Sequence, residues 1–421
     1  MGKSTRRLFA SRAWIDGAWA QDVLLAEEDG VWTEVRPDCG PADRGIVEKL
    51  AGPVVPTLVN AHSHAFQRAI AGLTERSPAG ERDDFWSWRD RMYQVALTLS
   101  PKDLERIATK LYGELVAAGY SHVCEFHYLH NDIDGKPYVD AAEMAWALAK
   151  AAHAAGIGLT LLPTLYMRSG FGATGLRDNQ RRFASTVDSV LRLAESFNHQ
   201  QKGGLPLNAG IALHSIRASD EGALREVAQA SRGAGWPVHI HVAEQQREVD
   251  ECLQQHGKRP IEWLLDTVPV DERWNLVHAT QATSQELRSV RGTGASIVLC
   301  PTTEANLGDG VFDLATWLQL DGSWSIGSDS HVCRDWREEL RLLEYSQRLV
   351  RRERNVAARA AGRESTAAVL FDGALRGGRA ATGAQACGLE VGARATWQVL
   401  KVEDPLVPAP GFELDAAIFS G

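Results

Sequence analysis

Short, almost continuous apolar segments recur along this chain, and stretches with helical periodicity separate them. The segments that stand out are residues 54–61, 122–126, 159–163, 208–214, 237–244, 274–278, 296–301 and 324–329. Strands that are apolar on both faces are typical of a parallel sheet covered by helices. The count reaches about eight, the number of strands that closes a TIM-type barrel. The sequence therefore predicts an α/β fold built on a (β/α)8 barrel.

The helix expected before the second of these strands shows how its ends are specified. Ser100 is a good capping residue, and Pro101 after it is favourable in a first turn. Gly119 stands where the helix should stop. Between these ends, apolar side chains share one helical face at residues 104, 107, 108, 111 and 115. The pattern predicts a helix that begins at Pro101 and ends before Gly119.

The barrel pattern does not use the whole chain. It occupies residues 57–384, whereas residues 1–56 contain short alternating strands with turn signals between them. Residues 396–402 are one more strand candidate near the other end. We therefore expect residues 1–56 and 385–421 to meet as one small β-sandwich domain formed by the N- and C-terminal segments.

The overall composition limits the function further. A net charge of −9 and a pI near 5.8 argue against a general nucleic-acid binder. No apolar stretch of about 18 residues predicts a membrane span. Arg12 and Asp16 interrupt the apolar run after the basic N-terminus, so a secretory signal is not expected. The six cysteines show no CxxC spacing, which fits reduced thiols in a cytoplasmic enzyme. We also expect a homodimer.

Side chains that bind metals collect at the ends of the predicted strands. His62 and His64 end the first strand, where residues two apart point to the same side. His241 ends the fifth strand and Asp329 the eighth. Three imidazoles and one carboxylate suit one zinc or ferrous ion better than calcium. The fourth strand ends without a lysine that could bridge a second ion. His239 lies one step deeper and is expected to pack inside the barrel.

Acidic and basic groups beside this predicted metal site favour hydrolysis. Asp329 can take the proton of an attacking water molecule. Glu244 follows His241 by three residues and can pass protons to a nitrogen of the substrate. His278 ends the sixth strand and can hydrogen-bond the attacking oxygen. The set predicts metal-dependent hydrolysis at an sp² carbon that bears nitrogen.

Longer segments give a more specific signal. They are TLVNAHSHAFQRA at 57–69, FWSWR at 85–89, EFHYLH at 125–130, HSIR at 214–217, HIHVAEQQ at 239–246, TEANLGDG at 303–310 and GSDSHV at 327–332. In these segments the chain resembles the amidohydrolase superfamily and, within it, the formimidoylglutamate deiminases of histidine degradation. The paired histidines and the last aspartate mark the superfamily alone, whereas the segments around 125, 244, 303 and 327 are far more specific.

The resemblance implies hydrolytic deamination of N-formimino-L-glutamate to N-formyl-L-glutamate and ammonia. It implies metal ligands at His62, His64, His241 and Asp329, proton transfer by Glu244 and His278, and substrate contacts at Gln67, Arg89, Tyr128, His214 and Arg217. The residues agree with a dianionic small-molecule substrate, because carboxylates call for arginine forks. Arg89 and Arg217 both follow barrel strands at the end where chemistry is expected. Trp86 and Trp88 are expected to pack rather than to contact the ligand.

Three positions depart from the family pattern. Gln281 stands where histidine is usual after the sixth strand, and Leu213 stands where proline is usual before His214. The chain also stops at Gly421, short of the final strands expected for the small domain. These departures affect a contact next to His278 and the small domain, whose C-terminal part is expected to be shortened. They leave the expected site residues unchanged.

The residues alone leave two other functions open. Another deaminase of the superfamily, acting on a purine, pyrimidine or related heterocycle, would use the same metal residues. Such an enzyme should prefer a pocket lined by aromatic side chains to one with two arginines. A metal-binding protein without turnover is the second alternative, and the intact set of metal and proton-transfer residues argues against it.

Overall fold

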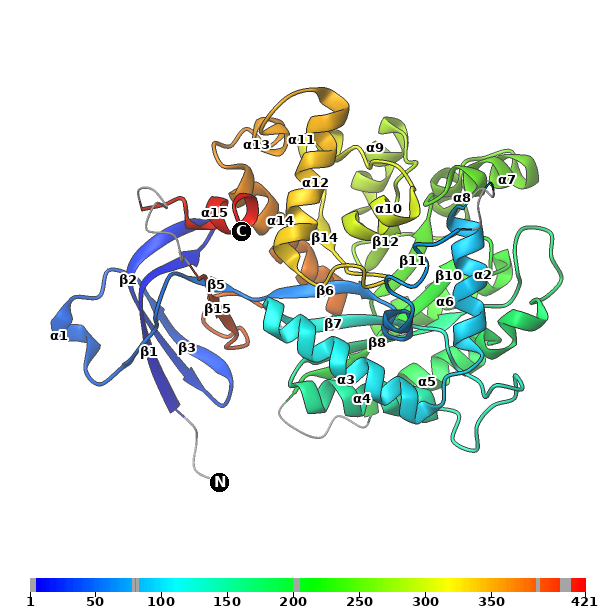
Figure 1. The fold of residues 1–421 in the computed structure, drawn as a ribbon, viewed down its shortest axis with the longest axis horizontal. Helices are drawn as coiled ribbons and strands as arrows, with labels where there is room; N and C mark the ends of the chain where they lie inside the picture. Colours follow the sequence, from blue (N-terminus) through cyan, green and yellow to red (C-terminus); the bar gives the residue numbers. More distant parts are fainter. Residues whose placement is uncertain (1–4, 78–79, 81–82, 200–204, 384–386, 402–409) are drawn as a thin grey trace.

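The computed structural model describes residues 5–77, 80, 83–199, 205–383, 387–401 and 410–421. Its main element is a sheet of parallel strands in the order β14-β13-β12-β11-β10-β8-β7-β6, with the short β9 (Leu207–Ala209) beside β8 (Figure 1). The strands in this order are β6 (Leu58–Ser63), β7 (Tyr120–His127), β8 (Gly158–Leu165), β10 (Ile211–Ser215), β11 (Val238–Val242), β12 (Trp274–His278), β13 (Ser296–Leu299) and β14 (Trp324–Ile326). The prediction of a (β/α)8 barrel is confirmed.

The barrel closes where the candidate metal ligands lie. The amide of Asp329 donates to the carbonyl of His62 at 3.0 Å, and the amide of His64 donates to the carbonyl of Asp329 at 3.2 Å. Gly327 permits this close approach, because a Cβ at that position would lie 2.5 Å from the Cβ of His62. Contacts between backbones therefore bring the two ends of the barrel sheet together at the candidate site.

Helices follow the strands and cover the outside of the barrel (Figure 1). They are α2 (Phe85–Ala96), α3 (Pro101–Ala118), α4 (Glu143–Ala155), α5 (Val187–His199), α6 (Glu221–Ala234), α7 (Gln246–His256), α8 (Pro260–Thr267), α9 (Ser284–Thr293), α10 (Pro301–Leu307), α11 (Leu314–Gln319), α12 (Trp336–Arg351), α13 (Val356–Ala360) and α14 (Thr366–Thr382), with the 3₁₀ turns η1 (Ala65–Ala69) and η2 (Asp178–Phe183). The predicted helix α3 is confirmed. Ser100 and Asp103 form its capping box, and Gly119 ends it with a φ of 104°.

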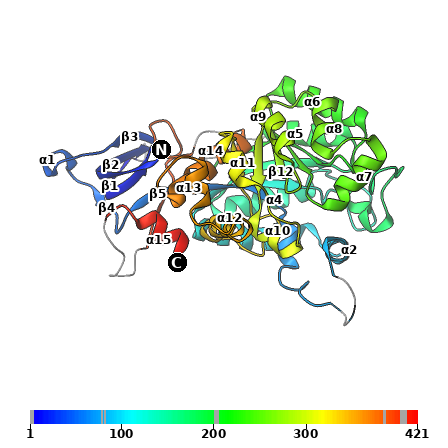
Figure 2. The same cartoon turned by 90° about the horizontal axis from the view of Figure 1, so that it is seen from above.

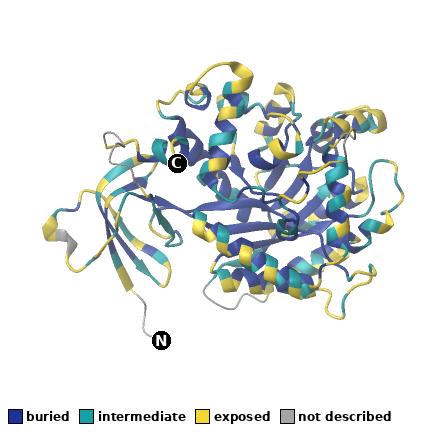
Figure 3. Ribbon diagram, in the orientation of Figure 1, coloured by how far each residue is buried: buried dark blue, intermediate teal, exposed yellow. Residues whose placement is uncertain are grey.

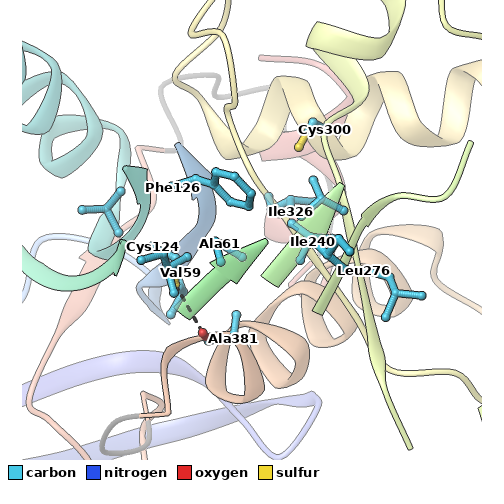
Figure 4. Packing of buried hydrophobic residues seen from close by; sticks show 14 of the residues in the cluster. Val59, Ala61, Cys124, Phe126, Ile240, Leu276, Cys300, Ile326 and Ala381 are labelled. Atoms are coloured by element: carbon cyan, nitrogen blue, oxygen red, sulfur yellow. Dashed lines mark hydrogen bonds between the residues drawn. The ribbon is translucent and has the colours of Figure 1, made fainter. Parts of the chain in front are cut away.

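The C-terminal end of α14 lies against the barrel strands on the side away from the candidate site. The carbonyl of Ala381 accepts a hydrogen bond from His239 Nε2 at 2.9 Å. It accepts another from Cys124 Sγ at 3.5 Å (Figure 4). These bonds satisfy a carbonyl that the helix itself leaves without a partner. Burial lowers the pKa of His239 to about 4, so its imidazole is neutral. His239 is a packed barrel residue, as the sequence predicts.

A second sheet lies beside the barrel (Figures 1 and 2). Its path is β15-β5-β1-β2-β3, with β4 on β1, and it consists of β1 (Thr5–Ile15), β2 (Ala18–Glu28), β3 (Val31–Arg36), β4 (Glu48–Lys49), β5 (Val54–Pro56) and β15 (Trp397–Val399). Segments from both ends of the chain thus form one small domain, as predicted. The sequence predicts a sandwich of two sheets, whereas the described residues of this domain form one sheet. The apolar segment 54–61 is divided between this sheet and β6. The predicted boundary at 384/385 lies outside the described residues.

Each sheet has its own hydrophobic core. The large cluster fills the barrel and the inner faces of its helices, while a small cluster that includes Leu8, Val23 and Trp32 lies under the second sheet (Figure 3). The short α1 (Pro41–Arg44) lies at the edge of this sheet region, and the terminal helix α15 (Glu413–Phe419) packs on α12 and α14. Among the described residues, no helix is both long and apolar enough to cross a membrane. All six cysteines are buried, and no disulfide joins them in the described structure.

Candidate active site

The structure brings nearly all of the predicted site residues to the wall of one cavity at the carboxyl ends of the strands. They are His64, Gln67, Arg89, Tyr128, His214, Arg217, His241, Glu244, His278 and Asp329. His62 is fully buried directly behind His64. These side chains come from β6, β7, β10, β11, β12, β14 and the loops or helices that follow, so the barrel geometry explains why they meet.

His62, His64 and Asp329 converge closely enough to share one metal ion, and His241 lies beside His62. His62 Nε2 lies 3.3 Å from Asp329 Oδ1, and His64 Nε2 lies 3.4 Å from the same oxygen. The Nε2 atoms of His62 and His241 are 3.0 Å apart. Ligand atoms of His62, His64 and Asp329 all lie within 4.8 Å of one another. A second group, His62, His241 and His278, meets the same limit, so the set of four ligands stays a prediction.

The hydrogen bonds of the imidazoles test whether these residues fit a metal. His64 Nδ1 lies 2.9 Å from the carbonyl of Phe126, and His241 Nδ1 lies 2.8 Å from the carbonyl of His214. A carbonyl can only accept, so Nδ1 carries the proton and the lone pair is at Nε2, which points into the cluster. Burial lowers the pKa of His62, His64 and His241, so all three are neutral donors. Three neutral imidazoles and a carboxylate fit a zinc-type ion.

His278 stands next to this cluster among acidic side chains. Its Nδ1 is 3.2 Å from Glu304 Oε1, and its Nε2 is 3.7 Å from Glu244 Oε1 and 3.8 Å from Asp329 Oδ2. Burial opposes the charge of His278, but Glu244 and the other carboxylates raise its pKa to about 10. Burial raises the pKa of Glu244 to about 7, against the pull of His278. The protonation states of Glu244 and His278 are therefore linked through their close contact.

Residues with left-handed backbone conformation stand at the strand ends and orient the side chains of the site. Ala243, His278 and Asp329 have φ values of 52°, 69° and 45°, which side chains other than glycine rarely adopt. Such conformations persist where the surroundings hold them, and they cluster at functional sites. Glu248 is one such support, because its carboxylate accepts the amides of Ala243 at 3.3 Å and Glu244 at 3.2 Å. The turn that presents Glu244 is thus held by a fully buried acid.

Two buried arginines face the same cavity. Arg89 and Arg217 are 7% and 4% exposed, and the Nε of each has no hydrogen-bond partner among the described residues. The guanidinium of Arg89 lies 4.4 Å from the ring centre of Trp86, and that of Arg217 lies 5.7 Å from it. Glu248 approaches Arg217 at 3.9 Å. Burial opposes the charge of Arg217, but Glu248 and Glu244 raise its pKa, so it stays cationic.

Neutral polar groups complete the wall. Gln67 Nε2 donates to Tyr128 Oη at 2.9 Å, and the Oε1 of Gln67 has no partner among the described residues. Burial lowers the pKa of His214, so this imidazole is neutral as well. Its ring lies 5.2 Å from that of His241. These groups can orient a polar ligand without adding charge to the cavity.

Sequence analysis missed several side chains that support the site. Glu248 and Glu304 are buried acids that hold Glu244 and His278 in place, as the contacts above describe. Glu125 is buried behind the histidine pair and accepts the hydroxyl of Ser63 and the amide of Ala65, both at 2.6 Å. The only signal for Glu304 and Glu125 was their position in specific motifs. Glu248 gave none, because its burial depends on how α7 packs.

Two further predictions about neighbours have clear outcomes. Gln281 donates from Nε2 to the carbonyl of Glu244 at 3.1 Å, so this departure from the family pattern still supports the turn. Trp86 packs, as predicted, but it packs against arginine side chains at the mouth of the cavity. Trp88 lines the cavity itself.

The barrel, its cluster of histidines and aspartate, and its acid pair define a hydrolase class. The chain belongs to the amidohydrolase family, whose model matches residues 54–368. It is 45% identical over 404 residues to the formimidoylglutamate deiminase of Pseudomonas aeruginosa, covering 94% of this chain and 86% of that protein. A crystal structure of an amidohydrolase from Brucella melitensis is 43% identical with a TM-score of 0.91, covering 99% of this chain and 91% of that one.

More distant relatives share the fold. A zinc-bound adenosine deaminase from Xanthomonas campestris superimposes with a TM-score of 0.78 at 21% identity, over 98% of this chain and 88% of that one. The 5-methylthioadenosine/S-adenosylhomocysteine deaminase of Halobacterium salinarum is 26% identical over 388 residues, which are 91% of this chain and 80% of that protein. The family is metal-dependent, which agrees with the His62, His64 and Asp329 cluster.

Proposed function

We propose that this protein is a formimidoylglutamate deiminase, which hydrolyses N-formimino-L-glutamate to N-formyl-L-glutamate and ammonia. The observation that carries the proposal is the pair of buried arginines, Arg89 and Arg217, in the cavity that also holds the metal-type cluster. A dianionic substrate supplies one carboxylate to each of these guanidinium groups, of which Arg217 also has Glu248 at 3.9 Å. The 45% identity to the Pseudomonas aeruginosa enzyme over most of both chains supports the same substrate.

We propose that His62, His64, His241 and Asp329 hold one divalent ion, zinc or ferrous iron. When bound, the ion supplies Lewis-acid chemistry that activates water and polarises the formimino group. A second ion is not expected, because no lysine lies among the described residues that line the cavity. Metal analysis of the purified protein should give one ion per chain, and His241→Ala should lose it. Two tightly held ions per chain would contradict the mononuclear site.

In the proposed reaction, water adds to the formimino carbon and the C–N bond to the terminal nitrogen breaks. Asp329 accepts a proton from the attacking water. Glu244 carries protons to the terminal nitrogen, so that this nitrogen leaves as ammonia. His278 lies between these two carboxylates and hydrogen-bonds the oxygen that develops charge. Glu304 fixes the orientation of His278 through its Nδ1.

The remaining residues of the cavity bind and orient the substrate in this proposal. Arg89 and Arg217 take its two carboxylates. Gln67, Tyr128 and His214 hydrogen-bond its polar groups, since they are neutral and line the same wall. The product keeps both carboxylates, so the arginines contact substrate and product alike, while the acid pair acts on the amidine end alone.

A deaminase acting on a heterocycle is the alternative, and distant relatives carry such names. Against it stand the two buried arginines, since a neutral ring offers them no carboxylate. Ammonia release should be measured with N-formimino-L-glutamate and with a panel of purine and pyrimidine amines. Turnover confined to the ring compounds would replace the proposal with the alternative.

We further propose that the enzyme acts in the cytoplasm and as a homodimer. All six cysteines are buried free thiols, which supports a reducing compartment. The assembly is tested by sedimentation of the purified protein, which should give twice the mass of one chain.

A further inference from the structure

A second, larger cavity lies outside the candidate active site. Its volume is about 340 Å³, and it shares Arg89 and Arg217 with the inner cavity. This volume is in the range of small-molecule pockets, roughly 300–1,000 Å³. The two cavities therefore meet at the two buried arginines, and the outer one lies on a path toward the reacting groups.

The outer cavity concentrates positive charge. Arg89, Arg177, Arg217 and Arg247 line it, with Glu251 as the acid among its lining residues. This is four cations against one anion in a chain whose net charge is −9. Arg247 pairs with Glu251 at 2.7 Å, whereas Arg177 forms no ion pair with any described residue. The local excess of positive charge attracts anions that the whole protein would repel.

Trp86 organises these arginines. The guanidinium groups of Arg89 and Arg247 each lie 4.4 Å from its ring centre, and that of Arg217 lies at 5.7 Å. The indole thus joins α2, which carries Arg89, to α7, which carries Arg247. Stacking on an aromatic face keeps a guanidinium in place while its N–H groups stay available to a ligand.

We propose that this outer cavity is a second binding site for small dicarboxylates, formed by Arg177, Arg247 and Trp86 together with the outward sides of Arg89 and Arg217. Its role rests on the proposed function: it captures the dianionic substrate before the amidine end enters the inner cavity. The reaction itself does not use Arg177 or Arg247. Arg89 and Arg217 are more than nine-tenths buried, and the Nε of each makes no hydrogen bond to a described residue, so these are the groups to which the captured carboxylates pass.

The test is calorimetric titration of the purified full-length protein with glutarate at low ionic strength. Glutarate has two carboxylates and no amidine, so its binding does not depend on the reaction. Arg177→Met and Arg247→Met should each weaken binding by about threefold or more, as loss of a charge contact at a partly exposed site does. Arg225→Met is the matched control, because Arg225 forms the same i,i+4 pair with a glutamate and is similarly exposed on α6.

Each outcome of the titration either supports the outer site or overturns it. Equal glutarate affinity in the parent and in both variants would overturn the outer site, as would an equal loss in Arg225→Met. A loss in Arg247→Met alone would overturn it too, since the effect would then come from Trp86 packing. If glutarate binds as expected but N-formimino-L-glutamate releases no ammonia, the outer site stands as a dicarboxylate site and the proposed function fails.

Discussion

Three buried acids surround one imidazole in this site, and a fourth supports the turn beside it. Glu244, Glu304 and Asp329 surround His278, and Glu248 holds the turn that carries Glu244. The acids nearest the imidazole keep its pKa high, while burial keeps that of Glu244 near neutrality. In the proposed reaction Glu244 passes protons to the leaving nitrogen, while Asp329 accepts the proton of the attacking water.

Glu244→Gln should keep the metal and lose activity. The amide has nearly the same shape but cannot carry a proton to the leaving nitrogen, so the rate should fall on the order of 10² or more. Metal content by mass spectrometry and steady-state ammonia release check the two parts. Glu226→Gln, on the exposed face of α6, is the control. Near-normal turnover in Glu244→Gln would show that the proton travels by another route.

Replacing either buried arginine should impair recognition of the dianion. A charge-assisted contact contributes roughly 1.5–3 kcal/mol. Arg89→Met or Arg217→Met should then lower kcat/KM on the order of 10–10², because about 1.4 kcal/mol corresponds to a factor of ten. A substrate analogue that lacks one carboxylate should show a smaller fall in kcat/KM when the arginine that binds this carboxylate is replaced. If both variants match the parent on N-formimino-L-glutamate, the substrate assignment fails.

At the scale of the elements, the ends of the strands bring distant residues together. Most of the site could therefore be predicted from the sequence. His62, His241 and Asp329 lie far apart along the chain, yet each follows an apolar segment, and parallel strands end at one edge. The supporting role of Glu248 could not be predicted, because no local pattern indicates which face of α7 is buried. The break between β5 and β6 was equally hidden, because Val54–Pro56 is as apolar as the barrel strand after it.

Small residues on α14 allow the helix to lie directly on the barrel. A Cβ at Gly377 would overlap the carbonyl of Trp324 on β14. Gly377→Ala should therefore destabilise the protein by about 1–3 kcal/mol, the usual cost of overpacking. Gly233→Ala on α6 is the matched control, since nothing lies within 4 Å of its added Cβ. That change should leave stability equal or raise it by roughly 0.5–1 kcal/mol. Denaturant unfolding measures both, and equal effects would contradict the close packing of α14.

For the whole molecule, buried acids make stability depend on pH. Glu339 is fully buried and accepts the amide and hydroxyl of Thr302 at 2.9 and 2.6 Å. Burial raises its pKa from 4.5 to about 8. As pH rises, the unfolded state thus releases the proton of Glu339 at a lower pH than the folded state does. The contribution of Glu339 is complete below about pH 4.5 and is lost as pH rises through about 8.

Glu339→Gln should remove this dependence, because the amide is neutral throughout and keeps an acceptor for Thr302. The free energy of unfolding of the variant relative to the parent should increase between about pH 5 and about pH 8. Denaturant titrations across that range measure the difference. A difference that stays constant with pH would mean that Glu339 is ionised in the folded protein at both limits.

Water attack on N-formimino-L-glutamate can break either of two C–N bonds, so product analysis tests the proposed reaction most directly. Metal-loaded protein should be incubated with the substrate and the products identified by NMR, with ammonia measured in parallel. The proposed roles of Glu244 and Asp329 predict N-formyl-L-glutamate and ammonia in equal amounts. Formamide with L-glutamate, or no conversion at one metal ion per chain, would contradict them.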